Sequence, residues 1–542
     1  MCTRYEYECT YDVEKTSDTI AVNDASLAVA SPTAKRTRPD QSQSKDVTST
    51  AAVHTPPSTA TGDKHSGRGY AGSCAATTFP HVLGIALGSS EYTNLLTTSS
   101  FAFNFGNRAE ESAKHRPDLS TLISQESLAQ YSAVYFSGLA TVIDLIDPAV
   151  YARRCQHYYD HDRTSGNAVA FSAIAAGVCA IGSFLSPNRC PRESEIVQYA
   201  KSLLDDTSSI RLPDVDHVIA WGFRMLYLRA TSRPNNAWLA SCMLMHLCEA
   251  VGLHDENSIQ RITSAPDAAV LGHTVDQLRR LFWIAWAGHS LLSYEYDRSP
   301  VTFGAVSCIV PLAQTLPGQF VAIAQLIPSM DRVSRSDDDG PVTPKAGLIE
   351  RLIALEALPC APHPFLAVTK ADLAFCFYRR LYQLKMGIPE EAIGIAITLG
   401  NAAAEAAVQL AGQGCLFWNV ISSVFQYACV LLAMDSPIAS EHIPAAFAAL
   451  EQVANSASTR LMRETLSIAR HLLGLRLTKK RRELARLEGI GEPQSDEQQL
   501  RQPVRIDDQM ANINAAEFDF DLDWDQFTIE PFLDMFGPEN GL

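Results

Sequence analysis

Apolar side chains recur at helical spacing over most of the chain between Leu119 and Leu487, and joints rich in proline, glycine and asparagine separate the runs. The pattern is clearest between Asp214 and Phe303, where two consecutive runs predict a pair of helices. The residues at this spacing are Ile219, Phe223, Leu226 and Ala230 in the first run, and Leu239, Cys242, Met243, Leu247 and Ala250 in the second. We expect both helices to be buried.

Local signals mark the ends of these helices. Pro234, followed by two asparagines, breaks the first run and offers an N-cap, and Gly252 offers a C-terminal stop. A third helix is expected after Thr274 and Gln277, which have the spacing of a capping box. Its predicted buried face holds Leu278, Phe282, Ala285 and Leu292.

Helical runs continue beyond Pro300, and no pair of strands is evident. The expected helices are Leu366–Met386, Ala392–Gly412, Leu416–Met434 and Pro444 to about Leu487. The sequence therefore predicts an all-α fold, a large helical array. Two stretches without charge, Ala168–Leu185 and Leu416–Met434, have nearly the length of a membrane span. Because small or polar residues interrupt them and no one-sided Lys/Arg cluster flanks them, we interpret both as buried core helices and expect no membrane partner.

The order of residues within the central block adds to this picture. The block resembles the middle homology region, the regulatory domain of fungal zinc-cluster transcription factors. The corresponding phrases are Ala237-Trp238, Val251-Gly252-Leu253-His254, Arg279-Arg280-Leu281-Phe282-Trp283 and Asp297-Arg298-Ser299-Pro300. Two positions depart from the family pattern: His289-Ser290 replaces an Asp-Arg pair, and Asp297 replaces the glycine of the closing turn.

The first residues of the chain resemble a second element of the same family. Cys2 and Cys9 have the spacing of the fifth and sixth ligands of a binuclear zinc cluster, which holds two metals with six thiolates. Two thiolates do not satisfy two tetrahedral zinc ions. The resemblance therefore implies zinc only if the other cysteines are restored, and without them we expect neither tight zinc binding nor recognition of a specific DNA site. Two unremarkable cysteines are the alternative.

Composition limits how the chain can meet DNA. The net charge is -16, so contact with phosphates requires a small basic module rather than the whole surface. Thirteen cysteines in 542 residues are too sparse for a disulfide scaffold, and no secretory signal is evident, which favours reduced thiols inside the cell. Basic runs at Lys35–Arg38 and Lys479–Arg482 are candidates for nuclear import signals. The alternative is a short solvated run for the first, and for the second a basic cluster that favours the C-terminal dipole of its helix.

The C-terminal segment has the acidic and aromatic composition of an activation domain. No Lys or Arg follows Arg505. Repulsion between the carboxylates is expected to prevent the apolar side chains from forming a hydrophobic core of their own. The apolar side chains then stay available to bind a groove on a coactivator. The side chains expected to bind are Phe518, Phe520, Trp524, Phe527, Phe532, Leu533 and Phe536.

Signatures of catalysis are absent from the sequence. It contains no Gly-rich phosphate loop, no Gly-x-Ser-x-Gly elbow and no Cys-x-x-Cys pair. His157 and His161 lie one helical turn apart beside aspartates, but no third ligand accompanies them. We therefore expect surface histidines here and no enzyme.

The predicted organisation has five parts. They are a zinc-cluster remnant (1–15), a disordered linker (16–118), the helical regulatory domain (119–487), a polar linker (488–510) and the activation tail (511–542). The resemblance implies a nuclear transcription regulator, an activator of a metabolic or secondary-metabolite pathway, that binds DNA in its full-length form. The alternative is an adaptor that does not bind DNA and holds another regulator or an inducer.

Regulation by a small molecule or a repressor protein is expected to act on the helical domain. The predicted site is the start of the third helix of the central block, at Arg279, Arg280, Phe282 and Trp283. The alternative is that the two aromatic side chains are core and the arginines pair with acidic neighbours.

Overall fold

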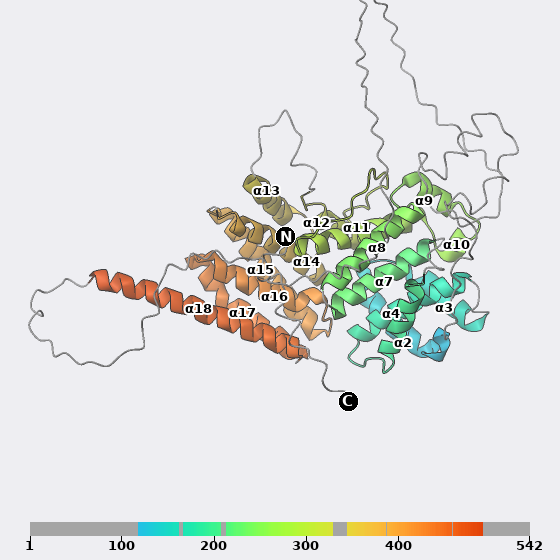
Figure 1. Ribbon diagram of the computed structural model, residues 1–542, viewed down its shortest axis with the longest axis horizontal. Coiled ribbons are helices and arrows are strands. Elements are labelled where there is room, and N and C mark those ends of the chain that lie inside the picture. The colour runs from blue at the N-terminus through green and yellow to red at the C-terminus, as the bar shows by residue number, and fades with distance from the viewer. Residues whose placement is uncertain are drawn as a thin grey trace, which may run out of the picture. The chain divides into compact units, whose positions relative to one another are not determined.

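The computed structural model describes residues 118–161, 166–206, 213–232, 234–328, 344–385, 387–457 and 459–491. Within these ranges every regular element is a helix, which confirms the all-α prediction. The buried apolar side chains form one continuous core that extends from Leu119 to Ala469. The helices at the beginning of this part lie at one side and α15 to α18 at the other, with α7, α8, α11 and α14 between them (Figure 1).

The first helices pack around α4. Their bounds are α2 (Gln125–Ser137), α3 (Pro148–Asp160), α4 (Gly166–Leu185) and α5 (Glu193–Leu204). α4 contacts α2, α5 and α7 and is apolar on nearly all sides. A Cβ at Gly182 would lie 1.9 Å from the carbonyl oxygen of Tyr131, so the close contact between α4 and α2 requires glycine at this position.

The central block forms the helices that its pattern predicts. Their bounds are α7 (Val215–Thr231), α8 (Pro234–Val251), α9 (Glu256–Thr263), α10 (Ala268–Leu271) and α11 (Val275–Glu295). The hydroxyl of Thr274 accepts a hydrogen bond from the backbone N–H of Gln277, as expected for an N-cap. Gly252 has φ of 90°, the left-handed conformation that ends a helix. A capping box that the sequence analysis did not single out joins Asp214 and His217 at the start of α7.

The predicted buried face of α8 is partly wrong. Leu239 is 53% exposed and Met243 is 40% exposed. Helical spacing identifies apolar residues on one face, but a neighbouring helix must still cover that face. α8 packs against α7 and α11 with a different face. The buried residues of α8 are Ala237, Ala240, Ser241, Leu244, Met245, Leu247 and Cys248.

The second half of the domain continues as consecutive helices that contact one another. Its helices are α12 (Leu316–Ala324), α13 (Pro344–Ala357), α14 (Pro364–Gln383), α15 (Glu390–Gly412), α16 (Trp418–Met434), α17 (Pro437–Ala457) and α18 (Arg460–Gly491). α14 packs on α15 and α16, and α11 joins this half through its contacts with α12 and α14.

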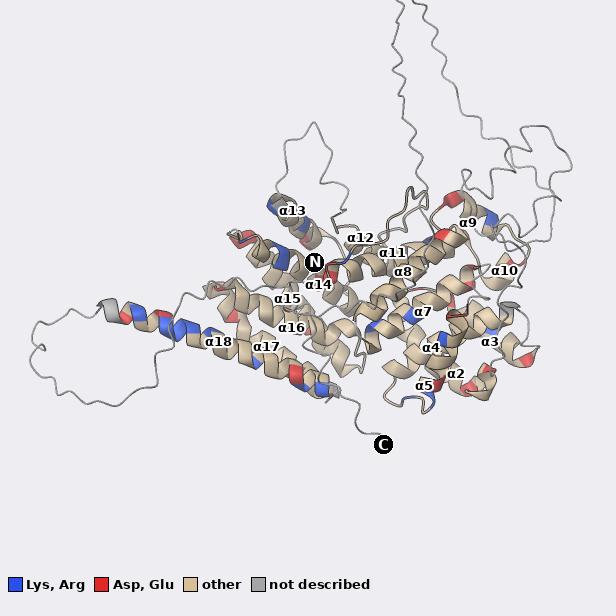
Figure 2. Cartoon of the chain, viewed as in Figure 1, with Lys and Arg blue, Asp and Glu red and all other residues tan. Residues whose placement is uncertain are grey.

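The single helix expected from Pro444 to about Leu487 is two helices. Pro444 lies inside α17, and α18 begins after Thr459, whose hydroxyl accepts from the backbone N–H of Met462. Beyond Ala469 the described part of α18 has no buried side chain, and Lys and Arg gather on this exposed half (Figure 2). The basic run Lys479–Arg482 is therefore accessible.

Two described helices are long and apolar enough to cross a membrane, namely Ala168–Leu185 within α4 and α15. A third span arises only if α8 and α9, which meet at a bend of 73°, are counted as one. α16, one of the two stretches noted in the sequence, begins at Trp418 and is shorter than this criterion requires. Other parts of the helical domain bury 78% of Ala168–Leu185 and 56% of α15, which is consistent with core helices.

Candidate functional site

A cavity lies at the centre of the helical domain, between α7, α8, α11, α12, α14 and α16. The space open to the centre of a water-sized molecule is about 70 Å³, and the empty space between the walls, including the part open to solvent, is about 790 Å³. One bound water needs about 10–15 Å³ on the first measure. The cavity therefore has room for a molecule larger than a single water.

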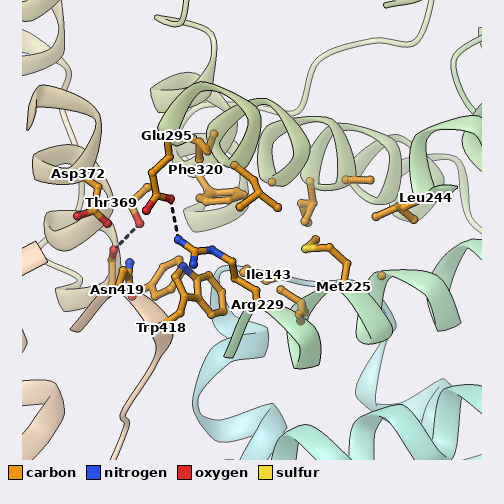
Figure 3. Close-up of a pocket in the computed structure, with 18 of the residues that line it drawn as sticks. Ile143, Met225, Arg229, Leu244, Glu295, Phe320, Thr369, Asp372, Trp418 and Asn419 are labelled. Carbon is orange, nitrogen blue, oxygen red and sulfur yellow. Dashed lines mark hydrogen bonds and ion pairs between the residues drawn. The ribbon is translucent and has the colours of Figure 1, made fainter. Parts of the chain in front are cut away.

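One end of the cavity is apolar. Met225 and Leu244 lie at this end, and Ile143 and Phe320 continue the apolar wall (Figure 3). These side chains belong to α7, α8, α12 and the segment before α3, and each is on the face that its element turns towards the core. The wall offers contact area to a hydrocarbon group and no hydrogen bond.

The opposite end of the cavity is polar. Its polar side chains come from four helices and gather around one part of the cavity (Figure 3). They are Arg229 of α7, Glu295 of α11, Thr369 and Asp372 of α14, and Trp418 and Asn419 of α16.

Arg229 and Glu295 neutralise each other at this end. Nη2 of Arg229 lies 2.6 Å from Oε2 of Glu295, and the two side chains are only 11% and 18% exposed. The guanidinium also donates to the hydroxyl of Tyr296 at 3.2 Å and lies over the rings of Tyr296 and Trp418, at 5.3 and 5.9 Å from their centroids. These contacts hold the pair in one geometry and keep its net charge at zero.

Asp372 lacks a comparable counter-ion. Burial, and after it the like charge of Glu295, raises the pKa of the Asp372 carboxyl well above its ordinary value, while Ser423, Arg229 and Arg379 lower it by less. Burial at this position therefore disfavours the charged form of the Asp372 carboxyl.

Two acceptor atoms at the polar end have no hydrogen-bond partner. They are Oδ1 of Asp372 and Oδ1 of Asn419, both shielded from solvent, and Asn419 as a whole residue is only 2% exposed. A buried polar atom without a partner costs about 1–3 kcal/mol. Thr369 at the same end differs, because its hydroxyl donates to the carbonyl oxygen of Phe365 at 2.7 Å. This end can therefore receive hydrogen bonds from a molecule that enters the cavity.

Comparison with known proteins places the chain among regulators of transcription. It is 37% identical over 457 residues to protein RDR1 of Saccharomyces cerevisiae, covering 83% of this chain and 78% of the relative. It is 31% identical over 471 residues to transcription factor kojR of Aspergillus oryzae, covering 85% and 82%. The chain belongs to a family of fungal transcription factors. A shorter match, 25% identical over 127 residues (23% of this chain and 29% of the relative), is to a probable transcriptional repressor of Schizosaccharomyces pombe. No model of a known protein family matches the chain.

The predicted regulatory residues of this fungal transcription factor lie in the first half of α11, away from the cavity, which α11 lines from Ile284 to Glu295. Nε of Arg279 donates to Glu256 at 3.2 Å, and Nε of Arg280 donates to Asp144 at 2.9 Å. Both arginines thus pair with acidic neighbours.

The two aromatic residues of the predicted site pack against or hydrogen-bond to neighbouring parts of the helical domain. Phe282 is fully buried in the core. Trp283 is half-buried and its indole N–H donates to the carbonyl oxygen of Cys308 at 3.3 Å. The structure thus has the arrangement that the alternative interpretation describes, in which this half of α11 joins neighbouring elements.

The sequence does contain a signal for the cavity. Arg229 follows Met225 and Leu226 at helical spacing, and Asp372 lies within the apolar run of α14. A charged residue on the apolar face of a helix must find a partner or a solvated space. This signal indicates that polar groups lie in the core, but it does not indicate that the side chains of Arg229 and Asp372 lie close together.

The other predicted sites divide into two groups. Cys2, Cys9 and the activation tail with Phe518, Phe520, Trp524, Phe527, Phe532, Leu533 and Phe536 lie outside the described residues. His157 and His161 are described: their rings stack with centroids 4.2 Å apart. Within the described ranges no three His, Cys, Asp or Glu side chains come together as a metal site.

Proposed function

We propose that the chain is a nuclear activator of RNA polymerase II transcription that controls a metabolic or secondary-metabolite pathway. Its helical domain is the regulatory part, its role is not enzymatic, and its tail contacts coactivators. The observation that carries this proposal is the 31% identity to transcription factor kojR over 85% of the chain. The acidic and aromatic composition of residues 511–542 supports activation rather than repression.

The activator proposal is tested with the tail. Residues 511–542 fused to an unrelated DNA-binding domain are expected to activate a reporter. Alanine at Phe532, Leu533 and Phe536 should reduce the output stepwise, because weak binding of such a segment is shared among several anchors. The matched control is Asp534→Asn, which should reduce the output less. A well-expressed fusion that leaves the reporter silent contradicts the proposal.

Two routes to DNA are compatible with a regulator. In the first, the segment with Cys2 and Cys9 belongs to a zinc module that binds DNA. In the second, the chain is an adaptor held by another regulator, which its net charge of -16 favours. A gel shift of CGG half-sites by a protein in which the other cysteines of the cluster are restored, abolished by a zinc chelator, supports the first route. Recruitment to promoters in cells without such a shift supports the second.

A further inference from the structure

The cavity combines features that belong to a binding site rather than to a packing defect. An empty defect in a core is normally apolar, because polar atoms without partners are costly. Here the side chains of Asn419 and Asp372 turn towards the same end as the Arg229–Glu295 pair (Figure 3), and each of the two has an acceptor oxygen without a partner. Four helices contribute to this end, so the site depends on the tertiary fold.

We propose that this cavity binds a small, uncharged amphipathic molecule with a branched hydrocarbon body and a hydrogen-bond-donating head such as a primary amide. The head lies at the polar end and donates to Oδ1 of Asn419 and Oδ1 of Asp372. The body lies against Met225 and Leu244. Any regulatory consequence of this binding rests on the proposed function, whereas the binding itself does not.

The charges at the polar end exclude an anionic head. The single positive charge, Arg229, already contacts Glu295 at 2.6 Å, so a carboxylate ligand would have to displace that partner. The Glu295 carboxylate would also face the ligand's negative charge. An amide brings two N–H donors and no charge, and therefore satisfies acceptors without new charge burial.

The dimensions of the cavity limit the body. The space of about 70 Å³ is roughly half of an engineered cavity of about 150 Å³ that admits benzene. The enclosed space alone is therefore too small for an aromatic ring, and a short branched chain with its head group must also use the part of the cavity that is open to solvent. Leucine and methionine walls adapt to such a shape, because methionine in particular is flexible.

A matched series of three compounds tests the head group on the full 542-residue chain. Isovaleramide, isovalerate and 4-methylpentan-2-one share one skeleton and differ only in whether the carbonyl carries NH₂, O⁻ or CH₃. Titrations followed by ligand-observed NMR should show isovaleramide binding about tenfold more tightly than either of the others, because only the amide satisfies the buried acceptors. Equal affinities, or tightest binding of isovalerate, would overturn the proposal.

Two matched variants locate the site. Asn419→Leu removes one of the two acceptors at similar volume and should reduce the preference for the amide over the ketone. Thr369→Val is the control: it lies at the same end, but its hydroxyl already donates to Phe365, so the preference should persist. An amide preference that is unchanged in Asn419→Leu places the binding elsewhere and refutes the proposal.

A third variant covers the case in which Asn419→Leu fails to fold, as judged by circular dichroism. Leu244→Phe fills the apolar end and should weaken the binding of both isovaleramide and 4-methylpentan-2-one without lowering the melting temperature greatly. Unchanged binding in a folded Leu244→Phe protein contradicts the proposal. The reporter assay is independent: loss of activation by the tail refutes the proposed function and leaves these titrations unaffected.

Discussion

Arg229 of α7 and Glu295 of α11 form an ion pair at the polar end of the cavity, with 2.6 Å between Nη2 and Oε2. The pair joins two helices that the central block of the sequence predicts and that both line the cavity. It also determines which ligand charges the polar end tolerates, since it leaves no cation available to an anion.

Breaking this pair should be costly. Arg229→Met leaves the Glu295 carboxylate largely buried without its partner, and we expect a loss of about 3 kcal/mol in the free energy of unfolding. Glu295→Met should cost a similar amount. The double variant should cost less than the sum of the two, because no isolated charge is left. Chemical denaturation of the four proteins measures this coupling, and additive effects would show that the pair does not interact.

The stability of the domain should depend on the neutral form of His289. The backbone N–H of Val301 donates to its Nε2 at 2.7 Å, and the Nδ1 side contacts the hydroxyl of Ser241 at 2.8 Å. Burial, with a smaller contribution from His246, lowers the pKa of His289 from 6.5 to about 4. Between about pH 6.5 and pH 4 the unfolded chain therefore binds a proton that the folded protein excludes.

This difference in proton binding makes the folded protein less stable as the pH falls. The contribution of His289 is present above pH 6.5 and is lost as the pH falls to 4, with a total of about 3 kcal/mol. Denaturation at several pH values should show less of this loss in His289→Gln, whose amide replaces the ring without titrating. The same pH dependence in both proteins would mean that other groups cause it.

Asp297 has a backbone conformation that favours glycine. Its φ is 53°, in the left-handed region. Asp297→Ala should lower the free energy of unfolding by about 1 kcal/mol, whereas Asp297→Gly should be neutral or slightly stabilising. The ion pair from Arg380, 3.0 Å away, adds little because the Asp297 side chain is 91% exposed. Equal melting temperatures for the two variants would argue against backbone strain here.

The first half of α11 offers a test that separates structure from regulation. Phe282→Ala should cost about 3–5 kcal/mol, because Phe282 is fully buried. Arg279→Glu places a carboxylate beside Glu256 and Asp276. If this region regulates, Arg279→Glu should change reporter output at unchanged protein abundance. Arg470→Glu, an exposed charge reversal on α18, is the control. A parallel loss of abundance and output shows a structural role only.

Local patterns in the sequence predicted the helices and several of their ends. α11 begins after Thr274 and buries Leu278, Phe282, Ala285 and Leu292, because its cap and its apolar spacing act within one helix. The closing turn also follows the pattern: Asp297 has a positive φ where the family resemblance expects glycine. Such features depend on neighbours in sequence.

Contacts between distant helices could not be predicted in this way. The exposed Leu239 of α8 shows that apolar spacing does not say which face a neighbour covers. The cavity is a stronger case, because Arg229 and Asn419 lie on helices far apart in the chain and meet only in the tertiary fold. The prediction of a regulatory site at Arg279 rests on a phrase within one helix and stays a prediction. A cavity shared by several helices leaves no such phrase in the sequence.

A ligand bound in the cavity should raise the amount of this protein in the cell, because the cavity exists only in the folded domain. α7 and α11 from the central block and α14 and α16 from the later half all meet there. A molecule that binds only the folded domain lowers the fraction that is unfolded at any moment. Proteases remove unfolded chains, so a cell rich in the ligand should accumulate more of this regulator even at constant synthesis. Protein turnover, measured with synthesis blocked, would then be slower in the presence of the ligand.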